Sequence, residues 1–448
     1  MTPVSRRSFM AGMAALPAMR ATRALSALPV NPGIIVIGGG VAGMAAANTL
    51  IDNGYPALIL EAKGHLGGRT YTEKETFGMP YDHGASILHS ADLNPLTDLV
   101  RANRFDVVNL SESETWLYMD GKEATAEQYE ALGQSLEDVA YKMDYGNEYY
   151  DKYGKDVSLR ILHPPSSRSD IIAHATIGPL VNGMETSRVS LYDVFQQTST
   201  GIEWGVPEGL GAAVNKALGD VPVSLKTPVR KVNWYNSDLI VETDLGNIST
   251  KAVIVTVPPV LIAEKKLQFD PPLPPWKWGA VRSLPMGNLD KVAIAFKPGY
   301  LDAIPENTMC LIHNGERGPV WEFVVRPYGR NMAIGHIGGK GANILRSQKE
   351  DAAIRAAVGA LMSAFGTGIK DAAIKGHYTN WGNDEWTRGA FSSQKVGAIL
   401  SREEMAKPLH QRLFFAGEAT SIEWSGSVAG AYSSGVRAAN EVLRWVKI

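Results

Sequence analysis

Three glycines near the start of the chain have the spacing of a phosphate-binding turn. Gly38, Gly40 and Gly43 form a G-x-G-x-x-G motif directly after the apolar run 34–37, which is typical of a buried strand. Such glycines allow a tight turn, the close approach of a pyrophosphate to the backbone, and close packing of the next helix on its strand. Glu61 stands eighteen residues after Gly43, where an acid that binds a ribose belongs.

The segments around this motif have the order that a dinucleotide site requires. The pattern predicts a helix over residues 41–53, ended by Gly54, and a second buried strand over residues 57–60. The N-terminus of that helix would face the phosphates, because its free N–H groups and its dipole favour negative charge. Glycine turns also join strands to helices for structural reasons alone, but strand, glycines, helix, strand and acid in this order favour a bound dinucleotide.

A second glycine-rich element points to one dinucleotide in particular. Residues 64–70 read GHLGGRT, and Gly67, Gly68 and Arg69 resemble the second glycine-and-arginine element of FAD-binding oxidoreductases. A simple NAD domain has no use for this element, so FAD is the predicted cofactor.

An acidic residue and the N-terminus of a helix, both near the end of the chain, suggest the other half of the FAD site. Residues 413–415 read as a short strand, and Glu418 follows it closely enough to lie beside a ligand. Small residues from Ser425 to Ala431 open a final helix, and the N-terminus of such a helix favours the electron-rich end of a reduced flavin. Close packing of a helix on a sheet also requires small side chains, and the two explanations are compatible.

The remaining segments predict the framework that positions these residues. Their order indicates a mixed α/β and α+β architecture, in which a Rossmann-like FAD-binding domain is interleaved with a substrate domain of antiparallel sheet plus helices. The FAD-binding domain is assigned to residues 31–92, 205–270 and 375–448. The substrate domain is assigned to residues 93–204 and 271–374, with helices expected at 95–102, 124–149 and 351–365 and strands at 291–296, 309–313, 321–325 and 332–336.

Composition excludes several classes of function. The 448 residues can bury a large core, and 44 basic against 46 acidic residues give no sign of nucleic-acid binding. The single cysteine, Cys310, rules out an intramolecular disulfide and a Cys-rich metal site, and we expect it in the core and expect no metal. The acidic residues between 112 and 148 would attract a cationic substrate, but a solvated helix face is the preferred explanation.

The first thirty residues have the features of an export signal. Residues 5–10 read SRRSFM, a weakly apolar run follows, and small residues at 24–27 suit a cleavage site. This pattern resembles a twin-arginine signal over residues 1–30, which predicts a periplasmic protein exported in the folded state. The apolar run is too short to span a membrane, and no other segment is expected to do so. A disordered basic tail is the alternative.

Together these motifs resemble the flavin-containing amine oxidases, which include monoamine oxidases, polyamine oxidases and the catalytic domain of lysine-specific histone demethylases. The resemblance covers residues 33–447 and is most specific at 36–69, 82–89, 228–232, 380–391 and 414–439. It implies FAD-dependent oxidation of a primary or secondary amine, a polyamine or a monoamine, to an imine that hydrolyses to an aldehyde. It also implies that O₂ is reduced to H₂O₂.

The resemblance also assigns roles to individual residues. Around the cofactor, it implies that the FAD pyrophosphate is held by Gly38, Gly40 and Gly43, and the adenosine ribose by Glu61. The phosphate and ribityl side would be held by Gly67, Gly68 and Arg69, with Glu418 as the acid near the ribityl chain. The Val229 backbone would bind the adenine, and the Val428 amide would face the pyrimidine edge of the flavin. Lys291 matches the lysine that contacts flavin N5 through a water, although an exposed strand lysine is the structural alternative. His89 matches a histidine at the active-site entrance of many polyamine oxidases, although a hydrogen-bonded core histidine is equally compatible.

Some positions depart from the best-known members of that family. Animal monoamine oxidases link a cysteine covalently to the flavin where this chain has Ala390, so we expect noncovalent FAD. Their two tyrosines that flank the amine correspond to Phe391 and Ser427, so half of that aromatic cage is missing. Trp381 and Phe391 are expected to offer apolar faces to the substrate instead, although large aromatic residues belong to the core by default.

Three functions remain open from the sequence. An amine oxidase comes first. An L-amino-acid oxidase would need an arginine aimed at the substrate carboxylate, for which Arg188, Arg326 and Arg388 are candidates, and a periplasmic amine dehydrogenase would use a quinone or cytochrome instead of O₂. A non-catalytic binding protein is disfavoured by Lys291 and the complete set of flavin motifs. The sequence fixes neither the amine nor the oligomeric state.

Overall fold

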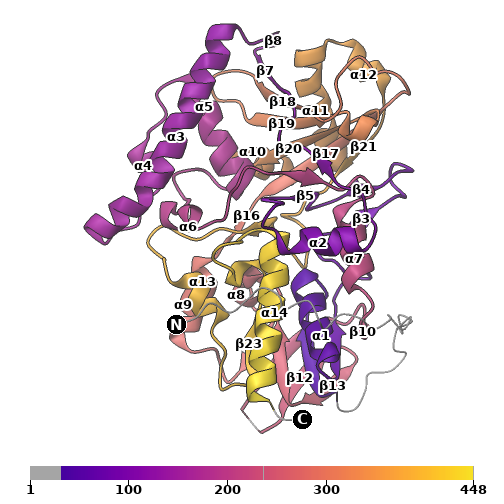
Figure 1. The fold of residues 1–448 in the computed structure, drawn as a ribbon, viewed down its shortest axis with the longest axis vertical. Coiled ribbons are helices and arrows are strands. Elements are labelled where there is room, and N and C mark those ends of the chain that lie inside the picture. Colours follow the sequence, from indigo (N-terminus) through magenta and orange to yellow (C-terminus); the bar gives the residue numbers. More distant parts are fainter. Residues whose placement is uncertain (1–31, 236, 447–448) are drawn as a thin grey trace, which may run out of the picture.

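The computed structural model describes residues 32–235 and 237–446, which form two lobes stacked along the long axis (Figure 1). The lower lobe contains a five-stranded parallel sheet with the order β10-β2-β1-β14-β23. Its strands are β10 (Val223–Ser224), β2 (Ala57–Leu60), β1 (Ile34–Ile37), β14 (Ala252–Val255) and β23 (Leu413–Phe415). Segments from the start, middle and end of the chain therefore meet in one sheet.

Alternate side chains of this sheet enter two different hydrophobic cores. In β1, Ile34 and Val36 pack against α1 (Val41–Asp52) and α14 (Val428–Trp445), whereas Ile35 and Ile37 face the opposite side, and all four are buried. Because both faces are covered, these strands are continuous apolar runs rather than alternating ones.

The opposite face is covered by a second sheet and short helices. The sheet has the order β13-β12-β11-β15 and consists of β11 (Val229–Asn233), β12 (Leu239–Thr243), β13 (Gly246–Thr250) and β15 (Gln268–Asp270). The helices are α8 (Pro259–Ala263), α9 (Pro275–Ser283) and α13 (Ser401–Ala406). Strands β11, β12 and β13 of this layer carry the chain from β10 to β14, and its other elements follow β14.

The upper lobe is built on a seven-stranded sheet with the order β21-β17-β20-β19-β18-β7-β8. Its strands are β21 (Ala373–Tyr378), β17 (Leu289–Phe296), β20 (Met332–Gly338), β19 (Val320–Val325), β18 (Thr308–His313), β7 (Thr115–Met119) and β8 (Lys122–Glu123). One face packs against α11 (Glu350–Phe365) and α12 (Gly368–Ala372), and the other packs against α3 (Ala126–Tyr153) and α5 (Arg168–Ala175). Pairing is antiparallel except between β7 and β18.

The remaining elements are short. The strands are β3 (Thr72–Glu73), β4 (Tyr81–Asp82), β5 (Ile87–Leu88), β6 (Val108–Asn109), β9 (Trp204–Gly205), β16 (Met286–Gly287) and β22 (Phe391–Ser392). The helices are α2 (Pro95–Ala102), α4 (Leu159–Leu162), the π-helix η2 (Thr176–Asn182), α6 (Leu191–Phe195), α7 (Leu210–Leu218), α10 (Gly339–Arg346) and the 3₁₀ turns η3 (Pro327–Gly329) and η4 (Glu418–Thr420). Small two- and three-stranded sheets join several of them.

Two helices pack on the lower lobe although the predicted boundaries place them in the substrate domain. Leu96 and Val100 of α2 are buried in the same core as α1, and α2 contacts α7 and α14. Ala280 and Val281 of α9 are buried on the opposite side of the parallel sheet. Most predicted helices and strands lie within a few residues of the observed ones, but α3 extends to Tyr153.

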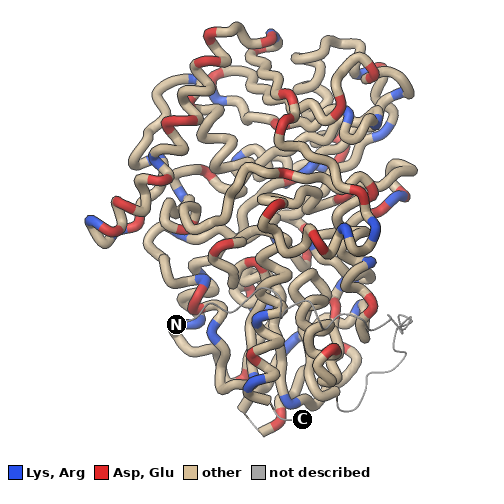
Figure 2. The backbone as a smooth tube through the Cα atoms, viewed as in Figure 1, with Lys and Arg blue, Asp and Glu red and all other residues tan. Residues whose placement is uncertain are grey.

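Charged side chains of both signs are distributed over both lobes (Figure 2). The acidic residues of α3, among them Glu127, Glu130 and Glu137, are exposed while Leu132 and Val139 are buried, so the predicted solvated helix face is confirmed. Cys310 is buried in the upper lobe, as predicted. In residues 32–235 and 237–446, no helix is long and apolar enough to cross a membrane, and no cluster of potential metal ligands occurs.

Candidate active site

The turn between β1 and α1 explains why each motif glycine is there. Gly38 has φ +106°, and a Cβ there would lie 2.6 Å from Oγ1 of Thr256. A Cβ at Gly43 would lie 1.9 Å from the carbonyl oxygen of Gly38. In contrast, a Cβ at Gly40 would have no described protein atom within 4 Å, and no described side chain caps α1. The turn is open only where a pyrophosphate would approach free N–H groups.

Glu61 lies directly after β2 and is 7% exposed. Its Oε2 accepts a hydrogen bond from the Gly39 N–H at 2.6 Å, and its Oε1 accepts one from the Lys63 N–H at 2.6 Å. A carboxylate has about four acceptor positions. Two positions therefore remain for donors such as the hydroxyl groups of a ribose.

The second glycine-rich element lies directly against the first. The Gly67 N–H donates to the Gly39 carbonyl at 2.9 Å, and Gly67 and Gly40 form a β-bridge. Gly67 and Gly68 have φ +97° and +60°, and a Cβ at Gly68 would lie 3.4 Å from Cα of Gly40. The two loops thus form one surface made of backbone, as a phosphate-binding site requires.

Arg69 joins this surface to the end of the chain. Its Nη1 donates to the carbonyl oxygen of Ala390 at 2.8 Å and to Oε1 of Glu418 at 3.0 Å. The predicted neighbours on the ribityl side, Arg69 and Glu418, are therefore in direct contact.

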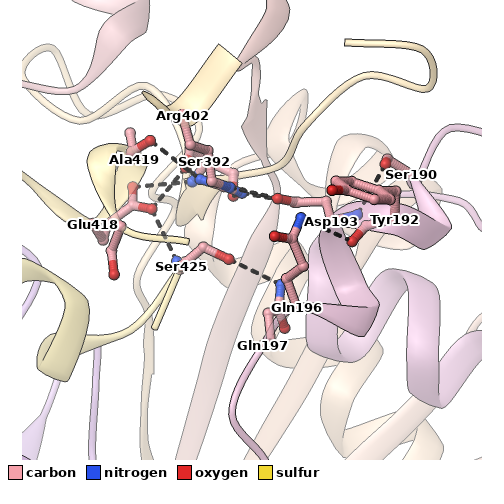
Figure 3. Close-up of polar contacts among 12 residues, drawn as sticks. Ser190, Tyr192, Asp193, Gln196, Gln197, Ser392, Arg402, Glu418, Ala419 and Ser425 are labelled. Carbon is pink, nitrogen blue, oxygen red and sulfur yellow. Dashed lines mark hydrogen bonds and ion pairs between the residues drawn. The ribbon is translucent and has the colours of Figure 1, made fainter. Parts of the chain in front are cut away.

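Glu418 is buried in a dense hydrogen-bond network (Figure 3). In addition to Arg69, Oε1 accepts from the Ser392 N–H at 3.0 Å, and Oε2 accepts from the Ser392 hydroxyl at 2.7 Å and from the Gly426 N–H at 3.1 Å. Burial alone would raise the pKa of Glu418, but Arg69 and Arg402 together with these hydrogen bonds lower it. All four acceptor positions are occupied. Unlike Glu61, Glu418 holds neighbouring segments in place and has no position left for a ligand hydroxyl.

Helix α14 begins at Val428, three residues after the predicted start of the helix at Ser425. The Ser427 hydroxyl caps the helix by accepting from the Gly430 N–H at 3.1 Å. Gly435, in the middle of α14, packs on Ala42 in the first turn of α1, because a Cβ there would lie 2.2 Å from the Ala42 carbonyl. Small residues in α14 therefore serve helix packing, while its N-terminus lies next to Gly426 and the Glu418 network.

Val229 begins β11 and is buried. The Thr227 N–H donates to the Glu61 carbonyl at 2.8 Å, which places the start of this strand beside Glu61. The predicted FAD residues thus form a continuous path from Val229 through Glu61 and the glycine turns to Arg69 and α14. An open backbone turn and an acid with two unused acceptor positions fit FAD.

Lys291 lies in β17 and is 7% exposed, so the alternative of an exposed strand lysine is wrong. Its Nζ donates to the carbonyl oxygen of Asp82 at 3.2 Å and to Oγ of Ser86 at 3.0 Å. Burial lowers the pKa of Lys291 to about 8, although the Asp82 charge opposes this change. A buried amine that titrates near neutral pH suits a residue that holds a water or a proton.

Asp82 is a site residue to which the sequence analysis gave no role. Its carboxylate accepts from the Leu210 N–H at 3.0 Å, the Gly211 N–H at 3.2 Å and the Thr72 hydroxyl, and so caps α7. Burial raises the pKa of Asp82, while Lys291 and these hydrogen bonds oppose the shift. The sequence feature that could have indicated this role is the position of Asp82 in the segment YDHGAS, which begins with a strand and returns toward the cofactor.

Trp381 is held beside the same loop. Its backbone N–H donates to Oδ1 of Asp290 at 2.6 Å, and its indole Nε1 donates to the His83 carbonyl at 3.2 Å. A Cβ at Gly84 would lie 3.3 Å from its ring, which shows how closely the ring packs on the loop 82–86. Asp290, next to Lys291, is a second positioning residue that the sequence analysis missed.

Phe391 and His89 do not lie with Lys291 and Trp381 at the loop 82–86. Phe391 lies in β22 opposite Gly287, and its ring is 3.7 Å from the position of a Cβ on Gly426. The His89 side chain is 60% exposed, and its Nδ1 lies 2.6 Å from Oε2 of Glu203. The structure thus gathers Lys291 and Trp381 around the loop 82–86, sets Phe391 beside the start of α14, and leaves His89 at the surface.

The arginines considered for an amino-acid oxidase have other surroundings. Arg388 pairs with Glu264 at 3.0 Å, and Arg326 lies 3.7 Å from Glu306 and 3.9 Å from Asp302. Arg188 is exposed next to η2. None of these three lies with Lys291 and Trp381 at the loop 82–86, so the structure does not favour recognition of a substrate carboxylate.

A nucleotide-binding lobe with two glycine turns, joined to a sheet that carries a buried lysine, defines a flavin-dependent oxidoreductase. Residues 36–102 match the NAD(P)-binding Rossmann-like domain, and residues 177–443 match the family described as flavin containing amine oxidoreductase. The chain belongs to this amine oxidoreductase family, and its cofactor is FAD.

Several curated proteins and solved structures are similar over most of the chain. Probable polyamine oxidase 4 of Arabidopsis thaliana is 27% identical, over 93% of this chain and 88% of that protein. Lysine-specific histone demethylase 2 of Homo sapiens is 24% identical, over 92% of this chain and 53% of that protein. Wild-type putrescine oxidase bound to putrescine has a TM-score of 0.77 with 19% identity, over 92% of this chain and 99% of that one, and therefore shares the fold.

Proposed function

We propose that this amine oxidoreductase oxidises a diamine or polyamine and transfers the electrons to O₂. The observation that carries the proposal is a row of three polar side chains across the upper sheet. Lys291 of β17 lies directly opposite His336 of β20, which lies directly opposite Glu322 of β19. Directly paired residues of antiparallel strands point to the same face of the sheet.

The Lys291 end of this row lies against the loop 82–86, because Nζ of Lys291 contacts Asp82 and Ser86. Nδ1 of His336 is 3.4 Å from Oε1 of Glu322, and their side chains are 13% and 25% exposed, so the pair is partly accessible. Glu322 lies two strands away from Lys291, or about 10 Å across the sheet. An acid at that distance can hold the second ammonium of a substrate whose first amine lies near Lys291.

Different residues of the chain have different roles in orienting the substrate. When bound, FAD supplies the acceptor for the two electrons and the proton that leave the α-carbon of the amine. Lys291, fixed by Asp82 and Ser86, holds a water or a proton at its Nζ. Trp381 and Phe391 exclude bulk water from their side of the site, and Glu322 fixes the distal end of the substrate.

The test compares amines of different charge. We expect faster turnover of putrescine and spermidine than of tyramine, with peroxide as the product. Substitution of Glu322 by Gln should raise KM for putrescine by about 10- to 100-fold, because a charge-assisted hydrogen bond is lost, and should change KM for tyramine little. The matched control is Glu114→Gln, an exposed acid next to β7 of the same sheet. Equal effects of Glu322→Gln on putrescine and tyramine would contradict the proposal.

The electron acceptor has its own test. Lys291 is buried, and a water held at its Nζ beside the flavin would favour O₂ as the acceptor. We expect one H₂O₂ per amine oxidised. Turnover that requires an added quinone or cytochrome, without peroxide, would show a dehydrogenase instead.

We also propose that FAD is bound without a covalent link. Position 390 is alanine, its carbonyl binds Arg69, and the single cysteine is buried in β18 of the upper lobe. Denaturation with acid should release the flavin into the supernatant. Flavin that stays with the precipitated polypeptide would contradict this assignment.

The predicted twin-arginine signal at residues 1–30 lies outside the described residues. We propose periplasmic export on the sequence pattern alone, because SRRSFM precedes a weakly apolar run. In cell fractionation, Arg6→Lys together with Arg7→Lys should retain the protein in the cytoplasm. Unchanged fractionation would exclude this route.

A further inference from the structure

The side chain of Arg402 in α13 is 2% exposed and lies between the two lobes. Its Nε donates to Oδ1 of Asp193 at 2.6 Å and its Nη2 donates to Oδ2 at 2.8 Å, which is a bidentate pair. Asp193 lies in α6, and its side chain is 6% exposed. Figure 3 shows this pair between the α6 segment and the residues around Glu418.

The remaining donors of Arg402 face the cofactor segments. Nη1 donates to Oγ of Ser392 at 2.9 Å and to the Ala419 carbonyl at 3.3 Å, and Nη2 lies 3.4 Å from the Ser392 carbonyl. The Ser392 hydroxyl in turn donates to Glu418 at 2.7 Å. A continuous chain of contacts therefore runs from Asp193 through Arg402 and Ser392 to Glu418 and ends at Arg69.

Two further contacts join the same segments. Nε2 of Gln197 donates to Oγ of Ser425 at 3.0 Å, and the Thr198 N–H donates to the Glu423 carbonyl at 2.7 Å. The stretch that contains α6 is thus attached to the loop that leads into α14. Any displacement of α6 would act on the loop from which the Gly426 N–H binds Glu418.

Stability alone does not explain a buried ion pair of this kind. Removing two charges from water is costly, and replacing both partners by neutral groups is often neutral or stabilising, whereas removing one partner leaves an uncompensated buried charge. What Arg402 provides is a fixed positive charge, which contacts Glu418 through the Ser392 hydroxyl while Asp193 neutralises it.

We propose that Arg402 is a positioning residue that fixes the orientation and the electrostatic balance of Glu418 beside the flavin, with Asp193 as its counter-charge. In the wild type, Arg69 and Arg402 balance Glu418 and Asp193. Loss of Arg402 leaves one excess negative charge, and loss of Asp193 leaves one excess positive charge. The inference rests on the flavin site of the family and not on the identity of the amine.

The sign of these changes gives a test. Reduction of a flavin adds negative charge, so a nearby positive charge raises its midpoint potential and a negative charge lowers it. Arg402→Met should therefore lower the midpoint potential, and Asp193→Asn should raise it. The double variant Arg402→Met/Asp193→Asn restores the balance and should return the potential close to that of the wild type.

The measurement is equilibrium reduction of the holoenzyme against a reference dye, with no amine present. Asp244→Asn is the matched control, because Asp244 forms a bidentate but exposed pair with Arg230 and should leave the potential unchanged. Shifts of opposite sign in the two single variants, with reversion in the double variant, support the proposal. Shifts of the same sign, or no shifts, overturn it, because a structural role would weaken FAD binding in both variants without this pattern.

A milder variant covers the case in which Arg402→Met does not retain FAD. Ser392→Ala removes the hydroxyl between Arg402 and Glu418 but keeps the backbone N–H that also binds Glu418. It should lower the midpoint potential by less than Arg402→Met, with a melting temperature close to that of the wild type. An unchanged potential in Ser392→Ala overturns the relay through Ser392.

Discussion

Alanine at Gly43 should lower the stability of the fold, whereas alanine at Gly40 should lower the affinity for FAD, although the two glycines belong to one motif. A Cβ at Gly43 would lie 1.9 Å from the Gly38 carbonyl, and normal contacts require at least 3.0 Å, so the backbone must move by about 1.1 Å. Such overpacking costs at least about 1–3 kcal/mol of unfolding free energy. Gly43→Ala should therefore melt at a lower temperature with or without FAD.

Gly40 is the N-cap of α1, with φ −72° and ψ −179°, a conformation that alanine adopts without strain. Loss of a favourable cap residue and the reduced entropy of the unfolded chain nearly cancel, so the unfolding free energy of the apoprotein should change by less than about 0.5 kcal/mol. The added methyl group occupies the place where the pyrophosphate approaches. FAD affinity should fall at least about 10-fold, which is about 1.4 kcal/mol.

Both effects are measured on purified protein. Thermal melts of the apoprotein report stability, and titration of the apoprotein with FAD, followed by the quenching of flavin fluorescence, reports affinity. A Gly40→Ala variant that binds FAD as the wild type does would refute the placement of the pyrophosphate at this turn. A Gly40→Ala apoprotein as unstable as Gly43→Ala would refute the contrast between an open and a closed position.

Two further predictions concern buried lysines. Lys277→Met should lower the unfolding free energy by about 2–4 kcal/mol in urea denaturation, because Nζ of Lys277 donates to the carbonyls of Glu404, Met405 and Lys407 at the end of α13. A change below about 0.5 kcal/mol would contradict that role. The pKa of Lys291 falls from 10.5 in the unfolded chain to about 8 in the fold, so between these pH values the unfolded state binds more protons and stability rises with pH. Across this pH range, the unfolding free energy of the wild type should rise by up to about 3 kcal/mol more than that of Lys291→Met. If the unfolding free energies of the two proteins change with pH in parallel, Lys291 does not titrate in this range.

The parallel sheet and the glycine motifs could be predicted because their signals are local. Ile34 to Ile37 are buried on both faces, and φ values above zero at Gly38, Gly67 and Gly68 demand glycine. The helix at 95–102 was also predictable from its own sequence, but its packing on α7 and α14 was not. That contact depends on residues more than a hundred positions away.

The parts of the site that the sequence did not give are long-range pairs. Asp82 and Arg402 appear as ordinary charged residues until the fold brings Lys291 and Asp193 to them. Glu322 becomes a candidate substrate-binding residue only because the strand register aligns it with His336 and Lys291. Glu418 was predicted beside the ribityl chain, and the structure shows that its acceptor positions are filled by the protein donors of Arg69, Ser392 and Gly426, which the sequence alone cannot reveal.

The central claim is that the chain oxidises amines at an FAD site. Anaerobic titration of the purified holoenzyme tests it most directly, because only the flavin and the added compound take part. Putrescine or spermidine should bleach the visible flavin absorbance at a ratio of one amine to one flavin, and admission of air should restore the absorbance. A flavin that L-amino acids bleach and amines leave oxidised would contradict this claim.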